Sequence, residues 1–146
     1  MKTTKIHLLL SIYSFLIFTD VLAQSFKTDT IELGNKQLSI NLPLIHKKNV
    51  SNYDEGIFVD YIFKNGAIIT FFNGVNQKLP LLDKERGYKP EKRKIIKNRS
   101  SSVGILNGKC WREDSYDSIR ILYDNVSPSE CKMFDYILDS VSILKY

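Results

Sequence analysis

Few side chains in this sequence have the chemistry of a catalytic group. After residue 23 the only histidine is His46, and the only cysteines are Cys110 and Cys131. His46 could act as the base for a serine or for the Cys110 thiol, but the motif Gly-x-Ser-x-Gly is absent and no catalytic-cysteine signature surrounds Cys110. The residue types therefore argue against an enzyme with a histidine-activated nucleophile.

Metal ligands and paired carboxylates are also sparse. One histidine and two distant cysteines do not have the spacing of a zinc site, and the acids at 113–117 do not form an EF-hand pattern. The adjacent acids Asp54–Glu55 and Glu113–Asp114 are expected in turns, although two carboxylates that meet in space would suit glycoside hydrolysis. We expect a protein without cofactor, metal or catalytic residues. A small hydrolase that uses acidic residues is an alternative.

The first residues have the pattern of a secretory signal peptide. Lys2 and Lys5 precede an apolar run over 6–18, and cleavage is expected between Ala23 and Gln24. The apolar run is shorter than the roughly 20 residues that a membrane span needs. We therefore predict that residues 1–23 are removed and that 24–146 form one exported domain, periplasmic or secreted, with no transmembrane span. An uncleaved membrane anchor is the alternative.

Cys110 and Cys131 are the only cysteines of the chain. An isolated pair in an oxidising compartment often forms a disulfide. We predict this bond, which would tie the last helix to the sheet; two buried free thiols are the alternative.

Most of the remaining sequence alternates apolar and polar residues in the manner of β-strands. Residues 30–42 alternate on both sides of Gly34-Asn35, which predicts a hairpin with one buried face. Residues 56–74 predict a second hairpin, with a two-residue type I′ turn at Asn65-Gly66.

Further strands are expected between 103 and 124, interrupted by a turn at 113–117. Residues 44–56 have little periodicity and are expected to be a loop, with or without one helical turn. Residues 73–102 are expected to be a long connection, with a short helix or an edge strand over 91–99.

The chain is expected to end in a helix with Ser127 as its N-cap. Ser127 and Glu130 have capping-box spacing, with Pro128 at the first helical position. The apolar stripe of this helix is predicted to be Cys131, Phe134, Ile137, Leu138 and Val141, with Asp135 and Asp139 facing water. The sequence thus predicts an α+β fold, with a mainly antiparallel sheet of about six strands and one C-terminal helix packed on it.

Positive charge is concentrated in a basic loop at 83–102. Residues 83–99 carry eight basic and three acidic side chains, net +5, whereas the rest of residues 24–146 sums to −1. The candidate binding residues of this loop are Lys84, Arg86, Tyr88, Lys89, Lys92, Arg93, Lys94, Lys97 and Arg99.

This charge has two interpretations. The loop is either solvated and packed against its own acidic neighbours, or it is a contact surface for an anionic partner outside the cytosol. Tyr88 is the only aromatic residue interleaved with the basic ones, whereas single-stranded nucleic-acid sites use several stacking platforms, so we expect no nucleic-acid partner.

Trp111, Arg112 and Tyr116 form a second candidate recognition feature. These residue types are typical interface anchors, although a lone tryptophan in a strand is more often part of a core. We conclude from the sequence that the chain is a small exported binding protein, one version of which is a periplasmic inhibitor or immunity-type protein. Its partner is expected to be an exported or envelope protein, or an anionic surface polymer.

Overall fold

The computed structural model describes residues 25–43, 46–74, 81–96 and 98–145. The predicted signal peptide, its cleavage position at Ala23 and Gln24, and the basic residue Lys97 lie outside these ranges. No helix formed by the described residues is long and apolar enough to cross a membrane.

The described residues form two antiparallel sheets and one short helix, so the predicted class is correct but the count of about six strands is too low. The smaller sheet has the order β1-β2-β10, and the larger one has the order β3-β4-β5-β9-β8-β7-β6. The strands are β1 (Phe26–Leu33), β2 (Lys36–Pro43), β3 (His46–Tyr53), β4 (Gly56–Phe63), β5 (Ile68–Gly74), β6 (Lys92–Ile96), β7 (Arg99–Leu106), β8 (Lys109–Tyr116), β9 (Ile119–Val126) and β10 (Ser142–Lys145).

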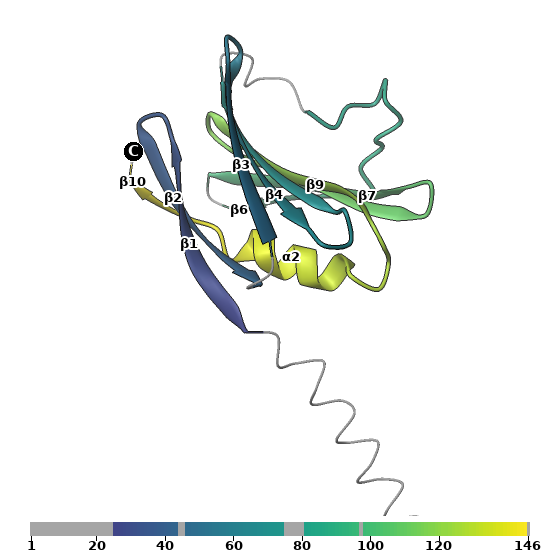
Figure 1. The fold of residues 1–146 in the computed structure, drawn as a ribbon. Helices are drawn as coiled ribbons and strands as arrows, with labels where there is room; N and C mark the ends of the chain where they lie inside the picture. Colours follow the sequence, from purple (N-terminus) through teal and green to yellow (C-terminus); the bar gives the residue numbers. More distant parts are fainter. Residues whose placement is uncertain (1–24, 44–45, 75–80, 97, 146) are drawn as a thin grey trace, which may run out of the picture.

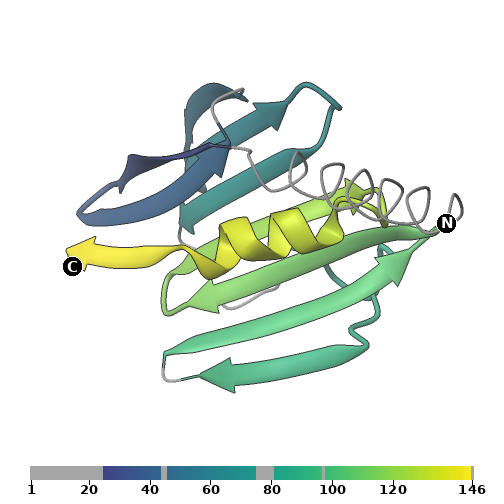
Figure 2. The same cartoon turned by 90° about the horizontal axis from the view of Figure 1, so that it is seen from below.

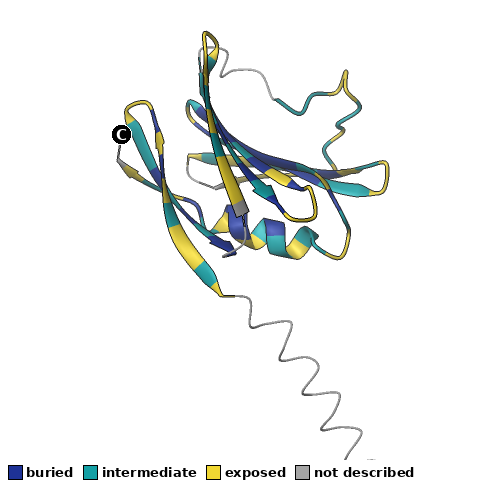
Figure 3. Cartoon of the chain, in the orientation of Figure 1, coloured by how far each residue is buried: buried dark blue, intermediate teal, exposed yellow. Residues whose placement is uncertain are grey.

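The helix α2 (Cys131–Asp139) lies across one face of the seven-stranded sheet, with the smaller sheet beside it (Figures 1 and 2). We call this covered side the inner face. Its core joins alternate residues of β4, β5 and β9 to the apolar side of β1 and β2 and to Phe134, Ile137 and Leu138 of the helix (Figure 3). The segment 81–91 lies on the opposite side, the outer face (Figure 1).

Both predicted hairpins are present, but one turn differs from its prediction. Gly34, at φ 67°, and Asn35 join β1 to β2, and the predicted buried face is fully enclosed. In the second hairpin Phe63 N–H donates to Ala67 O, so the turn has three residues rather than two, and only Gly66 of the predicted pair has a positive φ. This arrangement is the three-residue hairpin loop that ends in a left-handed glycine.

Two segments expected to be irregular are strands. Residues 46–53 form β3, at an edge of the large sheet, where mostly polar side chains hide the alternation of the strand. The predicted turn at 113–117 is wrong as well: β8 continues to Tyr116, and the turn lies at Asp117–Ser118. Of the two adjacent acid pairs, only Asp54–Glu55 is in a turn.

The start and end of the helix also differ from their predictions. Helix α2 begins at Cys131 with Glu130 as N-cap, and no side chain caps it. Ser127 instead donates its hydroxyl to the Glu130 carboxylate across a turn that includes Pro128. Val141 lies beyond the helix, and the chain continues into β10, which pairs with β2.

Candidate functional site

The segment expected to be one basic loop divides into three parts with different structures. Residues 81–91, here called the cover loop, cross the outer face without regular structure. Residues 92–96 form β6, which confirms the edge-strand alternative for this part, and Arg99 begins β7.

Buried Glu113 of β8 holds the start of the cover loop. Its two carboxylate oxygens accept hydrogen bonds from the backbone N–H groups of Leu81, at 3.1 Å, and Leu82, at 2.8 Å. Arg120 of β9 lies 3.5 Å from the same carboxylate. Burial raises the pKa of Glu113, and the two amide donors and Arg120 partly oppose this rise. Because its oxygens are already bonded, Glu113 acts as an anchor for the loop.

Tyr88 fixes the other half of the cover loop. Its hydroxyl donates to the Asp124 carboxylate at 2.7 Å, and its ring meets Trp111 edge to face at 5.4 Å between centroids. Gly104 leaves room for this contact, because a Cβ there would lie 2.8 Å from Lys89 O and from the Trp111 ring. The loop is therefore attached at both halves, and its basic side chains extend from an ordered backbone.

Burial, followed by the bond to Asp124, raises the pKa of Tyr88 to about 12 from 10.0. A raised pKa stabilises the folded state below pH 10.0, and this contribution is lost as pH rises through about 12. We expect Asp124→Asn to lower the pKa of Tyr88 while leaving it above 10.0, since the effect of burial remains. Alkaline titration of phenolate absorbance, with Tyr88→Phe as the reference that isolates this ring, measures the change. An unaltered pKa in Asp124→Asn would contradict the assignment.

A cleft of about 660 Å³, lined by both polar and apolar side chains, lies between the cover loop and the sheet. Small side chains from neighbouring strands, Ser100 and Ser102 of β7 and Ser115 of β8, leave the space, and Arg93 of β6 borders it. Cations and carboxylates both line this cleft, so it has no single charge that would select a ligand.

Six basic side chains lie outside the cleft floor, on the cover loop and on β6. All six are exposed, and within the described residues none of them forms an ion pair. This group, here called the basic surface, consists of Lys84, Arg86, Lys89, Lys92, Arg93 and Lys94. Asp83, Glu85 and Glu91 are interleaved with it, which leaves a net charge of +3 over 83–94.

Arg99 is separate from the basic surface. It lies on the inner side, where its guanidinium bonds to Asp114, at 2.5 Å, and to Asp139, at 2.9 Å. For this residue the structure agrees with the interpretation that basic side chains pack against the protein's own acids.

The three candidate interface anchors are buried. Trp111, Arg112 and Tyr116 are 1%, 6% and 8% exposed. Trp111 packs beneath the cover loop, while Arg112 and Tyr116 point to the inner side, because successive residues of a strand face opposite sides. In this conformation none of the three presents a surface to a partner.

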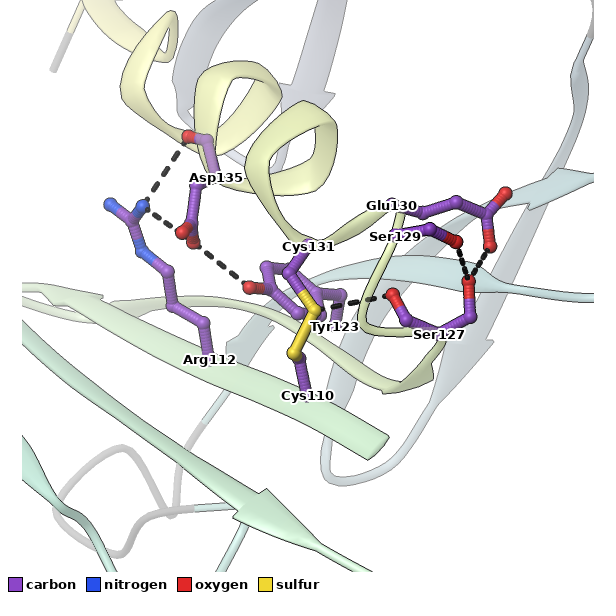
Figure 4. The surroundings of a disulfide bond; sticks show 8 residues. All are labelled: Cys110, Arg112, Tyr123, Ser127, Ser129, Glu130, Cys131 and Asp135. Atoms are coloured by element: carbon purple, nitrogen blue, oxygen red, sulfur yellow. Dashed lines mark hydrogen bonds and ion pairs between the residues drawn. A yellow bond between two sulfur atoms is a disulfide. The ribbon is translucent and has the colours of Figure 1, made fainter. Parts of the chain in front are cut away.

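The predicted disulfide is present and lies at one end of a row of paired residues between β8 and α2. Cys110 bonds to Cys131, with the Cα atoms 6.1 Å apart. Two residues further along β8, Arg112 contacts Asp135, which is one turn further along the helix (Figure 4). Arg112 also binds Asp139, a further turn along, and it holds buried Asp114 with two hydrogen bonds of 2.9 Å. Asp135 and Asp139 thus bind arginine instead of only facing water, which corrects their prediction.

The spacing of this row follows from backbone geometry. Four helical residues rise about 6 Å and two strand residues about 6.7 Å, so a helix that runs along a strand can match every fourth residue to every second one. The sequence contains this signal as Cys110 and Arg112, two residues apart, against Cys131 and Asp135, four residues apart, and it was not among the sequence-based predictions.

The arrangement of the acids limits a carboxylate mechanism. Glu113 faces the outer cleft, whereas Asp114 faces the inner side, so this adjacent pair cannot act on one substrate. Cys110 is bonded and is not available as a nucleophile for His46, whose backbone begins β3. Among the described residues, histidine, cysteine and acidic side chains do not gather into a metal-binding group.

No protein-family model matches the chain, and neither curated proteins nor solved structures show a significant match to it.

Proposed function

We propose that this chain is a small exported binding protein that uses the basic surface to contact an acidic partner. The observation that carries the proposal is the concentration of six exposed cations on the cover loop and the edge strand β6, none with an ion-pair partner among the described residues. By contrast Arg99 and Arg112 are bound to the protein's own carboxylates. Surface cations without internal partners speed the encounter with an anionic surface, and they repel a basic partner.

Export is supported by two features. The leader-like pattern of residues 1–23 directs a chain out of the cytosol, and the disulfide between Cys110 and Cys131 suits an oxidising compartment. The partner is then an exported or envelope protein with an acidic face, as for an inhibitor or immunity-type protein. An anionic surface polymer is the alternative partner. A nucleic-acid partner is disfavoured because the ring of Tyr88 already packs on Trp111.

The hydrolase alternative has less support. Glu113, the carboxylate buried in the outer cleft, is bonded to two backbone amides, and its neighbour Asp114 lies on the other side of the sheet. A binding function therefore accounts for more of the outer face than a carboxylate mechanism does.

A matched pair of fourfold variants tests the proposal. The first replaces Lys84, Lys89, Lys92 and Lys94 with glutamine, and the control replaces the exposed lysines Lys27, Lys47, Lys64 and Lys132. Both variants lose the same charge, so only the position differs. We expect the first to weaken binding by about tenfold or more and to reduce its salt dependence, since four favourable charge contacts of a few tenths of a kcal/mol are lost.

The measurement starts from the full chain, captured with its envelope extract at low and high salt. The partner is identified by mass spectrometry and purified, and its dissociation constant is measured for all three proteins. Equal weakening by both variants would mean that only net charge matters, and no weakening by either would exclude the basic surface. Diffuse binding that high salt abolishes would favour an anionic polymer over a single protein partner.

A further inference from the structure

The strand β6 is an unpaired edge of the large sheet. It pairs with β7 on one side, and within the described residues no strand pairs with its other side. Part of the backbone N–H and C=O groups of such an edge strand point away from the sheet, where they can pair with another extended chain. The opposite edge of this sheet is β3.

The side chains of β6 limit what can pair there. Lys92 and Lys94 project to the inner side of the sheet, and Arg93 and Ile95 to the outer side, as their registers with β7 require. All four are exposed, Ile95 at 80%. A second copy paired through β6 would bring the same three cations together, which like-charge repulsion disfavours. Lysine on an edge protects against this self-pairing.

An acidic strand would be attracted to the edge that repels a second copy of β6. Its carboxylates would lie opposite Lys92, Arg93 and Lys94 at cross-strand distance, where opposite charges attract. One apolar residue of that strand would cover Ile95. Protection of the edge against self-pairing explains the basic side chains of β6 but does not call for an exposed isoleucine. The edge therefore has both the hydrogen-bonding groups and the side chains that suit one class of partner.

We propose that β6 binds an extended acidic segment of a partner protein as an added antiparallel strand. The proposal rests on the proposed function and names the form of its partner. In this mode backbone hydrogen bonds supply affinity and side chains on both faces supply selectivity. The cover loop is held over the neighbouring strands, by Glu113 of β8 and by Asp124 of β9, and its Lys84 lines the same cleft as Arg93 of β6.

The probe is the blocked peptide acetyl-Thr-Val-Glu-Glu-Glu-Thr-amide, whose valine and three glutamates match Ile95, Lys94, Arg93 and Lys92 in antiparallel order. Its control carries N-methyl groups on two adjacent central residues. Each edge of the peptide strand then lacks one backbone donor, while every charge is kept. We expect the control to bind the full chain about tenfold more weakly, since one donor on the paired edge is lost and its methyl group holds the two backbones apart. Binding of the probe should also slow amide hydrogen exchange within β6.

Equal affinity for probe and control would overturn strand addition, as would protection that falls outside β6. A matched variant pair locates the apolar contact: Ile95→Ala should weaken the probe, whereas Ile105→Ala, on exposed Ile105 of β7, should not. The two proposals fail separately. If the probe does not bind while the basic fourfold variant still loses its native partner, strand addition is wrong and the proposed function stands.

Discussion

Replacing Arg112 with methionine is expected to lower the free energy of unfolding by about 3 kcal/mol, because Asp114 would keep a buried charge without its main partner. Asp114 is 0% exposed and receives two hydrogen bonds from the Arg112 guanidinium. The expected loss lies at the lower end of the range for broken buried pairs, since Arg99 still contacts Asp114. Urea unfolding, followed by circular dichroism, measures the change.

Two further variants separate charge from geometry. Arg112→Lys keeps the charge but loses the paired donors that match a carboxylate, so an intermediate loss is expected. Arg112→Met combined with Asp114→Asn removes both charges, and it should be more stable than Arg112→Met alone. If the single and double variants were equally unstable, the loss would come from packing against α2 and not from the unpaired carboxylate.

Removing the disulfide is expected to cost a similar amount, about 3 kcal/mol, for a different reason. The bond closes a loop between residues 21 positions apart, and it limits the unfolded chain more than the folded one. The variant Cys110→Ala with Cys131→Ala should therefore melt roughly 10 °C lower than the oxidised protein. Calorimetry under non-reducing conditions measures the difference.

The reduced wild-type protein is the control for this variant. With its thiols free it should unfold close to the double-alanine variant, because the residues around Cys110 and Cys131 are otherwise unchanged. Identical melting of the oxidised and reduced wild-type proteins would show that the bond adds no stability. Arg112 with Asp135 would then be sufficient to attach α2 to β8.

The two effects should not add independently. The disulfide and Arg112 hold the same face of α2 against β8, two strand residues apart (Figure 4). Contacts that share an element commonly interact when both are removed. The disulfide and the Arg112 contacts therefore attach the helix together. The carboxylates beside them also bind Arg99 and Arg112. Within the described residues, the six cations of the cover loop and β6 form no ion pair.

Local patterns in the sequence predicted the parts whose cause is local. Alternation around Gly34-Asn35 predicted the first hairpin and its buried face, because side-chain direction in a strand follows from a period of two. Asn65-Gly66 predicted the second hairpin, although the three-residue turn depended on how Phe63 and Ala67 pair. The cysteine pair and the concentration of charge at 83–99 were likewise visible in the sequence.

Only the tertiary structure decided which strands are edges and which charges have partners. The pattern of β3 is weak because it pairs on one side and carries polar residues, and β10 has only four residues and depends on β2. Arg99 and Arg93 look alike in the sequence, yet Arg99 reaches buried Asp114 while Arg93 is exposed on β6. Composition determines how much charge the chain carries. The packing of distant strands and the helix determines which charged side chains are bound internally and which are exposed to a partner.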